Sequence, residues 1–290
     1  MSAEVTLHDN IHHDLSADCQ HCFGLCCVAL PYAKSADFAF DKDGGTPCRN
    51  LQSNYQCSIH KDLREKGFRG CSAYECFGAG QKVSQITYEG KDWRNSPETA
   101  NQMFDVFPIM QQLHEMLWYL HEALSIDIAK PIHPELRTSF EKIERLTRLS
   151  KERLLTLQVD EHRAEVNEWL LKTSELVRAQ ARHPKLPKKV SRGSVLIGAK
   201  LKGLDLRGAN LRGALLIAAD LRNADLRMTD FIGADMRDAD LSGADLTGSI
   251  FLTQAQVNAA NGDSNTKLPL SVRTPAQLEI KKDPLTVLFY

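Results

Sequence analysis

The pattern of hydrophobic and polar residues is most regular near the end of this 290-residue chain. From residue 194 to residue 253 a period of five runs for twelve units. Each unit has a large apolar residue at its centre and a small residue two places earlier, which is alanine in eight of the twelve. A period of five matches neither the 3.6 of a helix nor the 2.0 of a strand. We therefore predict neither an amphipathic helix nor a plain array of strands.

These units resemble the pentapeptide-repeat family, whose units read Ala-(Asp/Asn)-Leu-X-X. The resemblance implies a right-handed quadrilateral β-helix with four units per coil, hence about three coils. In such a solenoid the central and the small side chains point inward and neighbouring coils share main-chain hydrogen bonds. Residues 254–259 are expected to form a short helix that caps the last coil. The twelve centres are Leu196, Leu201, Leu206, Leu211, Leu216, Leu221, Leu226, Phe231, Met236, Leu241, Leu246 and Phe251.

Apolar side chains also occupy some outward positions of the repeats. One set, on a single face of the first two coils, is predicted to contact something, because exposed apolar patches mark contacts. The chain's own helices or its apolar end, residues 285–290, are one cover; a homodimer or another protein partner is the other. A second set, Ile232, Ile250 and Leu252, is expected to face outward on the neighbouring side. The first set, which we call the apolar patch, is Val195, Ile197, Leu215 and Ile217.

Apolar residues at spacings of three and four indicate helices between residues 97 and 182. We predict one helix from Pro97, broken at Pro108, a second from near Pro134 and a third from near Asp160, packed as a small bundle. The two His-Glu pairs at 114–115 and 121–122 repeat at seven residues, whereas a helical zinc motif needs histidines four apart. A solvated helix face is therefore favoured over a metal site there.

All eight cysteines lie between residues 19 and 76, which suggests metal chemistry. The polar, acidic first ten residues show no export signal, and disulfide scaffolds belong to secreted chains, so metal is favoured over disulfides or free thiols. Thiolates favour zinc, copper(I) or iron–sulfur clusters. His60, at the end of a CxxH, is a weaker candidate; His8, His12, His13 and His21 read as ordinary surface histidines. The cysteines are Cys19, Cys22, Cys26, Cys27, Cys48, Cys57, Cys71 and Cys76.

The adjacent pair Cys26 and Cys27 bears on how many metal sites there are. Neighbouring side chains diverge, so the simplest geometry places the two in different sites or lets one of them bridge. Eight thiolates then divide into two four-ligand sites or make one polynuclear cluster. The pairing stays open at this point, and a structural site with four ligands leaves no position for catalysis.

The cysteine spacing resembles the CxxCxxxCC family of zinc- or iron-chelating domains. The resemblance covers residues 19–76 and includes Thr-Pro-Cys at 46–48 and Cys-Ser-Ile-His at 57–60. That family usually has tyrosine where His60 stands. The resemblance implies bound zinc or iron; we expect two zinc ions, with iron or an iron–sulfur cluster as the alternative.

Composition and charge exclude several classes. The 36 basic and 37 acidic residues leave a net charge of −1, which excludes a polycation and a strongly acidic disordered chain. No apolar run approaches the ~20 residues of a membrane helix, so we expect no membrane partner and a cytoplasmic location. The short basic stretch around Lys188 and Lys189 lacks interleaved aromatics, so a solvated linker is favoured over nucleic-acid contact.

The expected organisation is multidomain. A cysteine-rich metal-binding domain occupies residues 1–90, a helical region 91–183, a basic linker 184–193, the pentapeptide-repeat β-helix 194–253, and a cap and tail 254–290.

Three functions fit these parts. The favoured one is a non-catalytic metal-binding protein whose repeats act as a rigid scaffold, with no catalytic residues assigned. The second is a redox enzyme or sensor with an iron–sulfur cluster or an exposed thiolate. The third is the DNA mimicry that protects topoisomerases in some pentapeptide-repeat proteins. Residues 194–253 carry eight acids and seven bases, a net charge of −1, which weakens the third.

Overall fold

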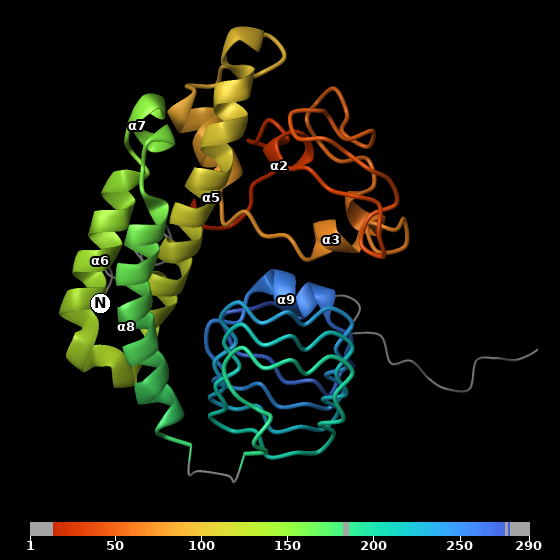
Figure 1. The fold of residues 1–290 in the computed structure, drawn as a ribbon, viewed down its shortest axis with the longest axis vertical. Coiled ribbons are helices and arrows are strands. Elements are labelled where there is room, and N and C mark those ends of the chain that lie inside the picture. The colour runs from red at the N-terminus through yellow and green to blue at the C-terminus, as the bar shows by residue number, and fades with distance from the viewer. Residues whose placement is uncertain (1–13, 182–185, 276–277, 279–290) are drawn as a thin grey trace, which may run out of the picture. The chain divides into compact units, whose positions relative to one another are not determined.

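A computed structural model describes residues 14–181, 186–275 and 278 (Figure 1). The chain divides into two compact units, residues 1–171 and 172–290, and the division falls inside helix α8. In the described part of the chain, no helix has the length and apolar character needed to cross a bilayer. The helices are α2 Leu25–Val28, η1 His60–Asp62, α3 Arg69–Ser72, α4 Ala79–Gln81, η2 Lys82–Thr87, α5 Pro97–Ser125, η3 Asp127–Ile132, α6 His133–Leu146, α7 Lys151–Leu155, α8 Val159–Arg178 and α9 Gln254–Ala259.

The predicted helices of the middle region are present. Helices α5 and α6 run side by side, and α5 buries one apolar stripe that includes Met103, Phe107 and Met110 (Figure 1). Partly exposed ion pairs link neighbouring helices, for example Arg163 to Glu115 at 2.9 Å between α8 and α5. Burial of the apolar stripe supplies the stability, since surface ion pairs contribute little.

The expected break at Pro108 is wrong, because α5 is one continuous helix of 29 residues. A proline inside a helix removes one main-chain hydrogen bond and costs about 3 kcal/mol. Here Val106, Phe107 and Met110 around the proline are completely buried. Their burial, at about 1.5–3 kcal/mol for each large apolar side chain, offsets that loss.

The cysteine-rich region has little regular structure, and a cluster of aromatic rings packs around the buried Phe68. Tyr32 stacks on Phe38 with 4.3 Å between ring centroids, and Phe40 meets Phe68 edge-on at 5.2 Å. Aromatic side chains bury large areas and prefer such stacked and T-shaped pairs. These ring contacts therefore help to hold the short helices and loops of this region together.

The second unit winds in stacked coils with a register of twenty residues (Figure 1). Parallel bridges join residues twenty apart, from Val195 with Leu215 to Asp230 with Ile250. In the described part of the chain these bridges are isolated single residues, and no continuous strand forms. All twelve predicted centres are buried, none more than 2% exposed. The expected inward side chains are therefore confirmed, and Leu204, a leucine where a small residue is usual, lies partly buried against the same core.

The coils end in the predicted cap. Thr253 forms a capping box with Gln256 at the start of α9, in which each side chain bonds the other residue's backbone N–H. After α9 the chain returns to the coils, and Asn261 bridges Asp240 while Lys267 bridges Asp245. The core of the second unit thus extends beyond residue 253.

The expectation that Ile250 and Leu252 face outward is wrong. Ile250 is 4% exposed and Leu252 is completely buried. Ile250 keeps the register, since it bridges Asp230. The chain leaves the register after Phe251 as it turns into α9, and Leu252 joins the core of the coils. Ile232 is partly buried.

Candidate functional site

The eight cysteines all lie in the first unit and are free thiols. Cys48 is buried, Cys19 is exposed and the other six lie between these extremes. In the described residues, no three or more His, Cys, Asp or Glu side chains are arranged to hold one metal ion. The predicted ligand set therefore stays a prediction. The fold does hold some of the thiols near each other, in two groups.

One group of thiols gathers around Cys48. The backbone N–H of Cys48 donates to the carbonyl of Cys27 at 2.9 Å, which holds these two residues side by side. Leu51 donates to the Cys48 carbonyl and forms an antiparallel bridge with Cys57, so a short turn brings Cys57 back toward Cys48. The hydroxyl of Tyr32 donates to the Cys48 sulfur at 3.2 Å.

The aromatic core brings Cys71 to the same group. Phe38, which stacks on Tyr32, lies so close to Gly70 that a Cβ there would overlap the ring. Gly70 therefore has no room for a side chain, and Cys71 follows it directly. The pKa of the Cys71 thiol is raised to about 12, by burial first and then by the charges of Cys27, Cys48 and Cys57.

A second group of thiols gathers at helix α4. Cys76 precedes α4 and Cys22 packs against its Gly80, where a Cβ would lie 2.7 Å from the Cys22 sulfur. The pKa of Cys76 is raised to about 12, by burial first and then by the charges of Glu75 and Cys22, while the backbone N–H groups of Gly80 and Gly78 oppose the rise.

Four hydrogen bonds fasten the Cys19–Cys22 segment to α4 and η2. Gln81 donates to the Ser16 carbonyl at 2.7 Å and accepts from the Asp18 N–H at 3.2 Å. Gln85 donates to the His21 carbonyl at 2.9 Å, and Ser84 accepts from the Phe23 N–H at 3.0 Å. These side-chain contacts hold the backbone around Cys19 and Cys22 against the helices that follow Cys76, although more than fifty residues separate the cysteines.

Cys26 and Cys27 join the two groups on helix α2. Their sulfur atoms lie 4.0 Å apart, and the Cys26 thiol donates to Cys27. This hydrogen bond raises the pKa of Cys26 and lowers that of Cys27. Burial and the charges of Cys22 and Cys76 raise the pKa of Cys26 as well, which relates Cys26 to the α4 group.

Lys42 is a buried cation beside these thiols that the sequence did not reveal. The residue is 6% exposed, and its Nζ donates to three carbonyls, those of Val28, Asp43 and Thr46, at 3.0 to 3.1 Å. Burial lowers its pKa, while the charges of Cys48 and Cys27 oppose that shift. Nothing in the spacing of a single lysine signals burial, so sequence reasoning had no basis for finding it.

Two of the histidine candidates, His60 and His21, lie in the described part of the chain. His60 is exposed at the start of η1, with its backbone N–H on the Cys57 carbonyl at 3.4 Å. The His21 ring bonds Asp18 at 2.6 Å. His8, His12 and His13 lie outside the described residues.

The expectation of a solvated helix face at residues 114–122 is wrong for its first member. His114 is 4% exposed, and Glu115 is paired with Arg163. His114 Nδ1 lies 2.8 Å from the Phe77 carbonyl, which contacts α5 from a segment 37 residues earlier. This histidine therefore supports the backbone that follows Cys76.

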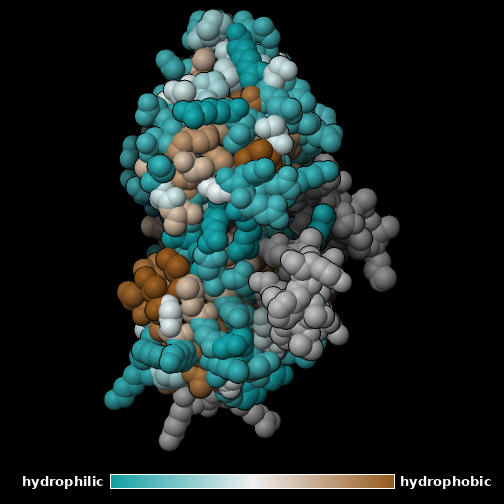
Figure 2. All heavy atoms as spheres, turned by 90° about the vertical axis from the view of Figure 1, so that its right-hand side faces the viewer, coloured by the Kyte–Doolittle hydropathy of each residue, from teal (hydrophilic) through white to brown (hydrophobic). Residues whose placement is uncertain are grey.

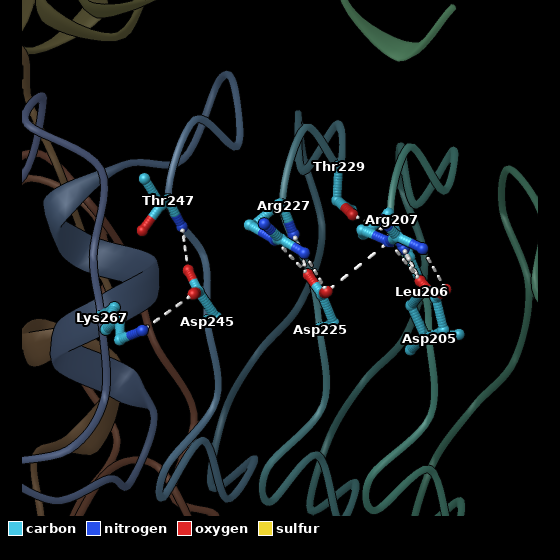
Figure 3. Close-up of polar contacts among 9 residues, drawn as sticks. All are labelled: Asp205, Leu206, Arg207, Asp225, Arg227, Thr229, Asp245, Thr247 and Lys267. Carbon is cyan, nitrogen blue, oxygen red and sulfur yellow. Dashed lines mark hydrogen bonds and ion pairs between the residues drawn. The ribbon is translucent and has the colours of Figure 1, made fainter. Parts of the chain in front are cut away.

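The outward positions of the repeats carry paired charges (Figure 3). Arg207 bonds the Asp205 carboxylate at 2.6 Å and reaches Asp225 in the next coil at 3.6 Å; Arg227 bonds Asp225 at 2.6 Å. Each aspartate drawn has a cation beside it, and Asp245 is paired with Lys267. The negative charge of this column is therefore cancelled locally.

Three residues of the apolar patch are exposed to solvent. Val195 is 71%, Ile197 55% and Leu215 37% exposed, and Ile217 is partly buried. The face in Figure 2 is mostly hydrophilic, with apolar side chains gathered in small areas. Of the basic linker, Lys188 and Lys189 are exposed, while residues 184–185 lie outside the described part.

Comparison with known proteins agrees with the coils. A sequence model of the family described as pentapeptide repeats matches residues 174–213 and 214–251, in eight copies. The chain belongs to the pentapeptide-repeat family. In this pentapeptide-repeat protein the family model begins to match at residue 174, inside α8. The first central residue of a repeat that is buried in the coils is Leu196.

The pentapeptide-repeat protein is also 99% identical over 276 residues to the uncharacterized protein YybG of Bacillus subtilis (strain 168). That alignment spans 95% of this chain and 99% of the relative. The solved structure of a pentapeptide repeat protein from Nostoc Pcc 7120 shares 38% identity over 27% of this chain and 72% of that one, with a TM-score of 0.21.

Proposed function

We propose that this pentapeptide-repeat protein is a non-catalytic, metal-binding scaffold of the cytoplasm, with two zinc ions held by its eight cysteines. The donor set supports this, because eight free thiols gathered within one small region suit zinc, and free thiols persist in reducing compartments. A structural zinc ion would contribute folding energy to a region that has little regular secondary structure of its own.

The observation that carries the proposal is the attachment of the Cys19–Cys22 segment to α4 and η2. Its hydrogen bonds join residues 61 to 65 positions apart and bring Cys22 to the residues that follow Cys76. Such long-range contacts in a loop-rich region are expected where side chains must meet at one place. If the cysteines were buried together only as apolar side chains, no polar side chains would be needed to position the backbone around them.

The repeat region acts in this proposal as the rigid part of the scaffold. We propose that its coils form a right-handed quadrilateral β-helix of about three coils. The twenty-residue register and the buried five-residue column support this architecture. The paired charges of Asp205, Asp225 and Asp245 argue against DNA mimicry, which needs sustained negative charge.

The metal content of the anaerobically purified chain tests the first part of the proposal. Zinc and iron are quantified by mass spectrometry and the visible spectrum is recorded. Two zinc ions per chain and a colourless protein are expected. Iron with acid-labile sulfide and a brown chromophore would instead establish the iron–sulfur enzyme or sensor, and a chain free of metal after growth with zinc would refute both.

The apolar patch is the contact surface in this proposal, and a second copy of the chain is its occupant. Sedimentation velocity measures the mass in solution. A mass of two chains that falls to one in Val195→Glu, but not in Lys200→Glu, is expected. Lys200 is an exposed outward residue one unit further along and so provides the matched control. A wild-type chain that stays monomeric at all concentrations would contradict the homodimer.

A further inference from the structure

We propose that the eight cysteines form two separate four-thiolate metal sites, with the buried ammonium of Lys42 as the counter-charge of only the second. The inference rests on the proposed metal-binding function and adds the assignment of each ligand. Site one is Cys19, Cys22, Cys26 and Cys76; site two is Cys27, Cys48, Cys57 and Cys71.

The contacts around Gly80 define site one. Gly80 faces the Cys22 sulfur at a distance that excludes a side chain, and Cys76 lies one turn before it. Gln81, Ser84 and Gln85 from the same stretch hold the backbone on both sides of Cys19 and Cys22. One short segment, residues 76–85, therefore organises three of the four thiols.

Site two has a different framework, made of backbone contacts and aromatic rings. Cys48 bonds Cys27 through the main chain, the Leu51 bridge returns Cys57, and the Tyr32–Phe38 stack against Gly70 places Cys71. None of these contacts involves α4 or η2. The two sets of thiols are thus held by separate parts of the fold.

A tyrosine supports the grouping at site two. The Tyr32 hydroxyl donates to the Cys48 sulfur at 3.2 Å, and its ring stacks on Phe38, which lies against Gly70. Tyr32 therefore connects the segments that carry Cys48 and Cys71.

Helix α2 lets adjacent residues serve the two sites. Consecutive residues of a helix point about 100° apart, at 3.6 residues per turn, so Cys26 and Cys27 face different directions. Their sulfur atoms, 4.0 Å apart, remain close enough that the two sites are neighbours. Metal binding would draw each set together, since sites rarely exist fully formed before the ion binds.

Lys42 distinguishes the sites by charge. A divalent ion with four thiolates carries two excess negative charges, which are costly to bury without a cation. The Lys42 ammonium is buried and also joins the Val28 carbonyl, next to Cys27, to the Thr46 carbonyl, two residues before Cys48. It is a positioning residue for two ligands of site two, because its hydrogen bonds connect the segments that carry Cys27 and Cys48.

Paired substitutions test the ligand assignment, with zinc content of the purified, zinc-loaded full chain as the readout. Wild type is expected to hold two ions. Cys22→Ser/Cys76→Ser and Cys57→Ser/Cys71→Ser, each within one site, should hold one. Cys71→Ser/Cys76→Ser removes one ligand from each site. After the same dialysis against a chelator, this variant should hold no zinc, whereas each within-site pair should still hold one ion.

Three other results of the zinc assay would overturn the ligand assignment or the proposed function. Loss of both ions in the within-site variants would establish one polynuclear centre and overturn the assignment. Retention of one ion by the cross-site pair, with none left in a within-site pair, would overturn the grouping. A wild-type chain without zinc would instead refute the proposed function itself. Cobalt(II) titration, with its visible absorption bands, counts the sites independently of the zinc assay.

Lys42→Met is then placed in both within-site backgrounds. In Cys22→Ser/Cys76→Ser, which keeps site two, zinc affinity in chelator competition should fall at least about tenfold, the usual effect of losing an outer-shell partner. In Cys57→Ser/Cys71→Ser, which keeps site one, affinity should change less than about twofold by the same rule. The second background also shows that Lys42→Met folds. Equal losses in both would overturn the role of Lys42 at one site.

Discussion

His114 Nδ1 and the carbonyl oxygen of Phe77 lie 2.8 Å apart, and the histidine ring is buried. Because a carbonyl only accepts, the ring nitrogen must donate. The His114 pKa is lowered to about 4, by burial first and also by the charge of Lys82, while the Phe77 carbonyl opposes the shift. The histidine is therefore neutral at pH 7, and it ties helix α5 to the residue that follows Cys76.

This depressed pKa predicts that acid weakens the first unit. Below the ordinary histidine pKa of 6.5, the unfolded chain binds a proton that the folded chain refuses until pH falls to about 4. Stability should therefore fall by about 2 kcal/mol between pH 7 and pH 5 from this residue alone. Denaturant unfolding followed by circular dichroism at both pH values measures the change.

The His114→Gln variant is the control for that prediction. Its side-chain amide can donate to the Phe77 carbonyl but does not titrate. Its stability should depend less on pH than that of the wild type, by about the same 2 kcal/mol. An identical pH dependence in both proteins would show that His114 contributes nothing to acid sensitivity.

A large-to-small substitution at Phe231 tests the core of the repeats. Phe231 is completely buried, and it is the central residue of the column that runs from Leu211 to Phe251. Phe231→Ala should destabilise the second unit by about 3–5 kcal/mol, since it leaves a cavity in a narrow interior. Ile197→Ala, at a side chain that is 55% exposed, should stay within about 0.5 kcal/mol. Unfolding in guanidinium compares the two, and equal losses would contradict the inward assignment.

The repeats were predictable from the sequence because one short period encodes both the corner and the core. Every centre from Leu196 to Phe251 falls inside as the register requires. The register fails only where a non-repeating element enters, as at Leu252 beside α9. The five-residue pattern thus predicts which side chains point inward as long as each coil stacks on another coil of the same repeat.

The cysteine region was predictable only as a set of thiols. Which ones lie together depends on contacts such as Gln81 with Ser16, which join segments far apart in the sequence. The burial of His114 and Lys42 has the same origin, because distant segments cover them. No periodicity encodes such contacts, and Pro108 shows that even a strong local signal yields to packing.

The paired charges at the outward positions of the repeats should contribute little to the stability of the second unit. Asp225 accepts from Arg227 at 2.6 Å and meets Arg207 from the previous coil at 3.6 Å, with all three partly exposed. Asp225→Asn should cost less than about 1 kcal/mol, and the loss should shrink further in high salt, which screens exposed pairs. Unfolding at two ionic strengths measures it. A loss above about 3 kcal/mol, unchanged by salt, would show that the pair behaves as a buried one.

Two glycines at the same place in the repeat provide the sharpest test of how the coils meet α8 within the second unit. Gly208 and Gly213 both turn the corner of a coil, with φ of 64° and 63°. A Cβ at Gly213 would meet nothing within 4 Å, whereas at Gly208 it would lie 2.7 Å from Ala181 Cβ and 2.9 Å from the Arg178 carbonyl. Arg178 also donates through Nε to the Gly208 carbonyl at 2.9 Å.

Gly213→Ala should therefore cost only the left-handed backbone, about 1–2 kcal/mol. The coils accept this elsewhere, since Ala218 holds the same corner with φ of 54°. Gly208→Ala must in addition displace the end of α8, so its loss should exceed that of Gly213→Ala by about 1–3 kcal/mol, the range for overpacking. Chemical unfolding of the two variants compares them directly. Equal losses would mean that the last turn of α8 is free to move away from the coil.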